Sequence, residues 1–183
     1  MSFFETNPKP LKLLLTQIHN GELALPDFQR DFVWDPSAIE ELIESIMRNY
    51  PAGSLLFLKH GGEGFQVREF EGAPILKSQM GTSYLVLDGQ QRMTSLYQAF
   101  YGKGEHRFFL DIKELMESGD IEAAVWHESE KRCQRQGLLK IENQAEKLIC
   151  PLQVVMGEGF DSWIDSIMDL RPEKAESAKE LRA

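Results

Sequence analysis

Two segments near the amino terminus carry apolar residues at the spacing of an amphipathic helix. Residues 10–19 form the first, whose apolar face consists of Leu11, Leu14, Leu15 and Ile18. The second begins where Asp35 can cap a helix and Pro36 suits its first position, and it ends before Pro51. Its apolar stripe consists of Ile39, Leu42, Ile43, Ile46, Met47 and Tyr50. The pattern predicts two helices that each bury one face.

Short apolar or alternating runs then indicate β-strands. They occupy residues 22–26, 54–59, 65–70, 83–87 and 106–112. The glycines of "GGEG" separate the second run from the third, which predicts a hairpin turn there. A helix is expected at residues 93–101, closed by Gly102.

Beyond residue 112 the chain becomes mostly helical and charged. Residues 160–168 carry one further apolar face, made by Phe160, Trp163, Ile164, Ile167 and Met168. The polar tail that follows has few apolar anchors, so we expect this chain to be the front part of a longer protein. The pattern predicts an α+β fold, with residues 1–112 as a domain built on a small mixed sheet and residues 113–183 as a helical extension.

Composition narrows the classes of function. The chain has 183 residues, 42% of them hydrophobic, and a net charge of −9, so it can fold but presents no basic face for gripping nucleic acid through phosphates alone. Cys133 and Cys150 have neither metal nor redox spacing, and no secretion signal opens the chain, which predicts a cytoplasmic protein. No apolar stretch is long enough for a bilayer, so no membrane partner is expected.

The segment "SYLVLDGQQRMTSLYQAF" carries the first candidate chemistry. A strand ends at Asp88 and Gly89 just before a helix, where unpaired backbone N–H groups attract anions. Gly89 permits positive φ or close approach to a ligand, the amides of Gln90 and Gln91 can donate and accept, and Arg92 offers a planar fork for phosphate. Asp88 beside them could hold Mg²⁺ or orient a water molecule. The competing interpretation is an ordinary turn with surface residues and Asp88 as a helix cap.

A second amide and guanidinium pair lies upstream, in "LPDFQRDFVW". Gln29 and Arg30 follow a strand among three aromatic residues, Phe28, Phe32 and Trp34. The aromatics could equally be core residues, with Arg30 paired to a nearby acid such as Asp31 or Asp35. Two such pairs, each at a strand exit before a helix, favour a shared anion site.

Together "LPDFQRDFVW", "IEELIESIMRNYPAGSLLF" and "LDGQQRMTSL" resemble the amino-terminal domain of the GmrSD-type modification-dependent restriction endonucleases. The resemblance covers about residues 10–112, and Leu25 stands where the family pattern usually has isoleucine. It implies a fold similar to ParB and sulfiredoxin and a domain that binds, and also hydrolyses, nucleoside triphosphates. In relatives this domain is joined to a His-Asn-His nuclease and serves in defence against phage with modified DNA.

The resemblance also implies which residues act. Gln29, Arg30 and the run from Asp88 to Arg92 would line the nucleotide site. Arg30 and Arg92 would hold phosphates, Asp88 would hold Mg²⁺ or orient the attacking water, and the glutamines would fix orientation. Asp27, Asp31 and Asp35 are weaker candidates for a second carboxylate, with Asp35 assigned to capping. No nuclease motif occurs in this chain, so DNA would be reached through the full-length protein.

Two alternatives remain open at the level of sequence. One is a non-enzymatic module that reads modified DNA, with Phe32 and Trp34 as stacking surfaces and Arg30 and Arg92 on the backbone. The other is a scaffold in which both Gln-Arg pairs bond to backbone carbonyls. The preferred base, the balance of binding and hydrolysis, the DNA modification and the oligomeric state are not fixed by these residues.

Overall fold

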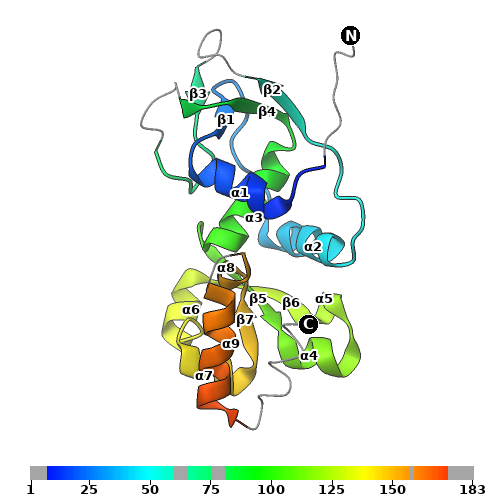
Figure 1. Cartoon of the computed structure of the whole chain (residues 1–183), viewed down its shortest axis with the longest axis vertical. Coiled ribbons are helices and arrows are strands. Elements are labelled where there is room, and N and C mark those ends of the chain that lie inside the picture. The colour runs from blue at the N-terminus through cyan, green and yellow to red at the C-terminus, as the bar shows by residue number, and fades with distance from the viewer. Residues whose placement is uncertain (1–7, 60–65, 76–80, 157–158, 173–183) are drawn as a thin grey trace.

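The computed structural model describes residues 8–59, 66–75, 81–156 and 159–172 and confirms the α+β class (Figure 1). Two small sheets lie in different halves of the molecule, with helices packed around each. The expected "GGEG" turn and the polar tail after residue 172 lie outside the described residues.

The first sheet has the strand order β2-β4-β1-β3. Its members are β1 (Leu23–Pro26), β2 (Leu56–Lys59), β3 (Val67–Arg68) and β4 (Tyr84–Asp88). Strand β1 runs parallel to β4 in the centre, while β2 and β3 pair antiparallel at opposite edges. The predicted hairpin between β2 and β3 is therefore wrong, because each of these strands takes a central strand as its partner. The parallel central pair matters most for the site, since both of its carboxyl ends lie at the same edge.

Three helices build the core against this sheet. They are α1 (Leu11–His19), α2 (Pro36–Met47) and α3 (Gln90–Tyr101). Helix α3 is buried over almost its whole length, and Met93, Leu96 and Tyr97 contact the apolar faces of α1 and α2 within one cluster. The apolar stripes predicted for α1 and α2 thus meet on a third helix. This central packing fixes where α3 begins and what its first turn faces.

The second sheet is antiparallel, in the order β6-β5-β7. Its strands are β5 (His106–Asp111), β6 (Val125–Ser129) and β7 (Ile149–Pro151). Strand β5 was predicted, whereas β6 and β7 fall in the segment expected to be helical. That segment does add helices: α4 (Ile112–Ser118), α5 (Ile121–Ala124), α6 (Glu130–Gln136), α7 (Ile141–Lys147), α8 (Leu152–Val155) and α9 (Gly159–Leu170). Since β5 pairs with strands on the far side of residue 112, the sheet crosses the expected domain boundary.

A separate apolar cluster supports the second sheet. The predicted face of α9 supplies Trp163, Ile164 and Ile167, which pack against Ile112 and Leu148. The indole Nε1 of Trp163 donates to the buried amide oxygen of Gln144 at 2.8 Å, so this large side chain is buried with its polar atom satisfied. Among the described residues no helix combines the length and the apolar run needed to cross a bilayer.

Asp35 caps α2, as predicted. Its side chain accepts a hydrogen bond from the Ala38 N–H at 3.0 Å, and Pro36 follows at the first helical position. We expect Asp35→Ala to lower the free energy of unfolding by about 1 kcal/mol, the usual cost of a lost cap. Urea denaturation measures this, and Asp35→Asn, which keeps the acceptor, should lose less. Equal losses in the two variants would show that the cap hydrogen bond is not what Asp35 contributes.

Candidate functional site

The parallel pairing of β1 and β4 brings the two predicted segments together. Leu23 lies opposite Tyr84 and Ala24 opposite Leu85, so both strands leave the sheet at one edge. A cavity of about 230 Å³ opens at this edge. All seven residues predicted for the site line it, and Leu87 and Trp34 complete the lining: Gln29, Arg30, Trp34, Leu87, Asp88, Gly89, Gln90, Gln91 and Arg92. Residues almost 60 positions apart in the chain thus share one cavity.

The bend between β4 and α3 depends on Gly89. Its φ is +91°, and α3 begins at Gln90, three residues earlier than the sequence suggested. A Cβ atom at this position would collide with a methyl group of Leu55 and crowd the Arg92 guanidinium. Positive φ and close packing therefore both require glycine here. The early helix start places Gln90, Gln91 and Arg92 in its first turn.

The glutamine amides hold the edge of the sheet together. Gln90 donates to the Arg30 carbonyl oxygen at 2.7 Å, and Gln91 donates to the Asp31 carbonyl oxygen and accepts from the Val33 N–H, both at 3.0 Å. Gln29 donates in the opposite direction, to the Leu87 carbonyl oxygen at 3.0 Å. Each amide bonds to the backbone of the other segment. For the glutamines this is the bonding that the scaffold alternative predicted, and it fixes the cavity wall.

Arg92 is largely engaged with backbone as well. Its guanidinium donates to the Ala52 and Ser54 carbonyl oxygens at 2.5 and 2.7 Å and lies 3.4 Å from an Asp88 carboxylate oxygen. Three of its five N–H groups are used in this way, so two remain for other partners. Arg92 ties the segment between α2 and β2 to the start of α3, and its positive charge stays at the cavity.

Arg30 differs from Arg92, because its side chain is exposed and has no hydrogen-bond or ion-pair partner among the described residues. Its carbonyl oxygen, in contrast, is fixed by Gln90 and by Arg68, which donates at 2.9 Å. Arg68 also bonds to the Gln29 carbonyl oxygen at 3.0 Å and lies 4.0 Å from the Asp31 carboxylate. Sequence reasoning missed Arg68, since a single cation on a short strand carries no motif. Arg68 holds the loop in place while the Arg30 guanidinium remains available.

The start of α3 supplies further donors. This helix has 12 residues, and no side chain caps its amino terminus in the described part of the chain. The first backbone N–H groups of a helix lack intrahelical partners and carry partial positive charge. Here they belong to residues that line the cavity. The site therefore combines one available guanidinium, one engaged guanidinium and an uncapped helix terminus.

Asp88 is the carboxylate of this cavity. Its side chain is 69% exposed, which leaves oxygen atoms accessible beside Arg92. Asp27, Asp31 and Asp35 do not belong to the lining. Within the described residues no group of three or more acidic, histidine or cysteine side chains could hold a metal ion. An Mg²⁺ ion at Asp88 would therefore take most of its ligands from phosphate and water, which is common for this ion.

A family model of the GmrSD restriction endonuclease N-terminal domain matches residues 11–173. The chain belongs to this family. The match extends beyond residue 112, where the sequence resemblance was expected to end, and includes the second sheet. Both sheets are thus part of the GmrSD N-terminal domain.

One similar protein is much longer than this chain. The uncharacterized protein MJ0686 of Methanocaldococcus jannaschii is 34% identical over 187 aligned residues, which cover 91% of this chain and 32% of that protein. The chain thus spans about a third of the length of this relative.

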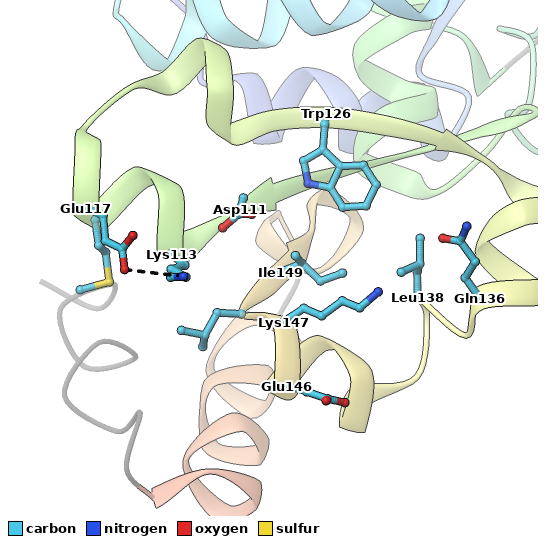
Figure 2. A pocket seen from close by; sticks show the side chains of 11 residues that line it. Asp111, Lys113, Glu117, Trp126, Gln136, Leu138, Glu146, Lys147 and Ile149 are labelled. Atoms are coloured by element: carbon cyan, nitrogen blue, oxygen red, sulfur yellow. Dashed lines mark ion pairs between the residues drawn. The ribbon is translucent and has the colours of Figure 1, made fainter.

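A larger cavity lies elsewhere, at the second sheet and the helices around it. It measures about 950 Å³, and its wall includes Trp126, Lys147 and the paired Lys113 and Glu117 (Figure 2). Trp126 stacks on Phe109 with ring centroids 4.6 Å apart. Acidic and basic side chains both occur around the cavity, so it has no clear preference for an anion. None of the residues predicted for the site borders it.

Proposed function

We propose that this GmrSD N-terminal domain binds a nucleoside triphosphate with its phosphates at the start of α3. The observation that carries the proposal is the combination of the uncapped α3 terminus and the available Arg30 guanidinium in one cavity. Backbone N–H groups at a helix terminus bind phosphate oxygens, and a guanidinium adds two parallel hydrogen bonds. Arg92 contributes charge and its two remaining N–H groups while it fixes the wall.

We further propose that the bound nucleotide is hydrolysed in the presence of Mg²⁺. Asp88 is the residue for this step, because its exposed carboxylate lines the cavity and lies 3.4 Å from the guanidinium of Arg92. It would hold the ion or orient the attacking water, while Arg30 and Arg92 offset the charge that builds on the phosphates. Mg²⁺ would supply additional positive charge to the phosphate oxygens.

In the cell, we place this nucleotide site within a longer phage-defence protein. The family name associates the domain with restriction endonucleases, and the relative in M. jannaschii continues well beyond the shared region. DNA would then be bound and cut by the full-length protein, with nucleotide acting at the amino-terminal domain. The net charge of −9 supports this division, since it disfavours DNA binding by this chain alone.

A thermal-shift screen with ATP, GTP, CTP and UTP, each with and without Mg²⁺, tests binding. At least one nucleotide should raise the melting temperature, and inorganic tripolyphosphate should do so as well, because the proposed contacts are to phosphate. A duplex of hydroxymethylated or glucosylated DNA is the competing ligand. Steep salt-dependent stabilisation by the duplex with no response to nucleotide or tripolyphosphate would overturn the proposal and favour a DNA-reading module.

Asp88→Asn tests the hydrolytic half. The substitution keeps an acceptor for Arg92 but removes the charge, so we expect nucleotide binding without Mg²⁺ to persist. The rate of phosphate release with Mg²⁺ should fall by about tenfold, because one contact to a charged group contributes about 1.5 kcal/mol and this energy corresponds to a factor of about ten. Asp169→Asn, an exposed acid on α9, is the matched control. Unchanged phosphate release in Asp88→Asn would exclude this carboxylate from the reaction.

A further inference from the structure

Trp34 forms a wall of two cavities. One is the 230 Å³ cavity at the start of α3, called the phosphate cavity below because of its proposed role. The other measures about 300 Å³ and lies between the start of α2, the far end of α3 and the start of β5. The second cavity is bordered by the apolar side chains of Phe32, Ile39 and Phe108. Each cavity by itself is small for a complete nucleotide, but the two cavities share the Trp34 side chain as part of their walls.

Helix α3 runs alongside both cavities. Its first turn lines the phosphate cavity, and Gln98 lines the second. Gln98 lies eight positions after Gln90, which corresponds to about 12 Å along the helix axis. An extended nucleoside triphosphate separates its base from its terminal phosphate by a comparable distance. The spacing of the two cavities along α3 therefore matches the length of a single nucleotide that occupies both.

The polar groups of the second cavity suit a neutral heterocycle better than an anion. Glu71 and Glu105 both line it, opposed by the single ammonium of Lys103, so phosphate would be repelled. The aromatic and aliphatic side chains of the wall offer surfaces for a flat ring, and the polar side chains beside them can fix its orientation.

Two side chains there can read the edge of a base. Gln98 is only 7% exposed and donates weakly to the Glu71 carbonyl oxygen at 3.4 Å, which leaves its own amide oxygen as an acceptor. His106 has a lowered pKa because of burial and the neighbouring His127. It is therefore neutral near pH 7 and offers one donor and one acceptor.

We propose that this second cavity holds the nucleobase of the nucleotide whose phosphates lie at the start of α3. Gln98 and His106 contact the edge of the base, and Trp34 lies against its ring. This inference rests on the proposed function, which supplies the phosphate end of the ligand. The 950 Å³ cavity of Figure 2 is not the base site, since its lining comes from the second sheet and the helices around it, and none of it is shared with the phosphate cavity.

The affinity of each nucleotide, compared with that of inorganic tripolyphosphate, gives the contribution of the nucleoside part to binding. In the wild-type chain the preferred nucleotide should bind more tightly than tripolyphosphate. Leucine is close in size to glutamine, and Gln98→Leu should lower the affinity for that nucleotide by roughly tenfold because a hydrogen bond to the base is lost. The affinity for tripolyphosphate should stay unchanged. Trp34→Phe should weaken nucleotide binding severalfold through reduced stacking, which provides a second variant with an aromatic ring retained. Gln134→Leu, at an exposed glutamine of α6, is the matched control.

The outcomes separate the two proposals. If neither tripolyphosphate nor any nucleotide binds the wild-type chain, the proposed function is wrong and the base site with it. If both bind and neither Gln98→Leu nor Trp34→Phe changes the affinity for nucleotide relative to tripolyphosphate, the base site is wrong while the phosphate site stands. A loss confined to nucleotide in both variants supports the base site.

Discussion

Arg30→Ala should remove nearly all stabilisation by nucleotide while leaving the free protein as stable as before. The guanidinium is exposed and has no partner among the described residues, so its loss breaks no contact of the fold. Two charge-assisted hydrogen bonds to phosphate are worth about 3 kcal/mol, or roughly 100-fold in affinity. At a nucleotide concentration 100 times the wild-type Kd, stabilisation should fall from about 2.7 to about 0.4 kcal/mol. Urea denaturation with and without nucleotide measures both quantities.

The same variant separates the proposed site from the scaffold alternative. A structural role for the Arg30 side chain would lower the stability of the free protein and leave ligand response intact. Arg30→Lys keeps the charge without the fork and should recover only part of the affinity. Arg135→Ala, at an exposed arginine of α6, controls for the change in net charge. If Arg30→Ala binds nucleotide as tightly as Arg135→Ala, the phosphate role of Arg30 is wrong.

Gly89→Ala should lower the free energy of unfolding by about 3 kcal/mol. Left-handed backbone costs a residue with a Cβ about 1–2 kcal/mol, and the contact with Leu55 adds overpacking strain of about 1–3 kcal/mol. The strain falls on the bend that places the first turn of α3, so nucleotide binding should weaken with it. Urea denaturation gives the first quantity and thermal shift with nucleotide the second.

Gly119 provides the matched control for that substitution. Its φ is +69°, at the carboxyl end of α4, but a Cβ there would meet no atom within 4 Å. Gly119→Ala should therefore cost only the conformational part, about 1–2 kcal/mol. Equal losses at the two glycines would mean that the Leu55 contact contributes nothing to the need for glycine at residue 89.

The sequence was enough to predict those helices whose own residues carry a clear pattern. The helices α1, α2 and α9 were predicted because each carries an apolar face at helical spacing, and Asp35 with Pro36 marked one boundary. Strands β6 and β7 were not predicted, because neither segment carries a strand pattern of its own. Val125–Ser129 is mixed in polarity and Ile149–Pro151 is three residues long, so each is a strand only because β5 lies beside it.

The site divides in the same way. The sequence by itself determined which residues gather there, because amide and guanidinium groups after strand exits have a distinctive chemistry, and it also determined the helix faces that bury α3. Only the tertiary structure decided what each side chain does. Apart from the Asp88 carboxylate beside Arg92, the partners of Gln90, Gln91 and Arg92 are backbone carbonyl and N–H groups about 40 to 60 residues away, which almost every residue type has. Pairing of β1 with β4 selects among them, and together with the bonds from Arg68 and Gln90 to the loop it leaves the Arg30 guanidinium at the cavity without a partner among the described residues.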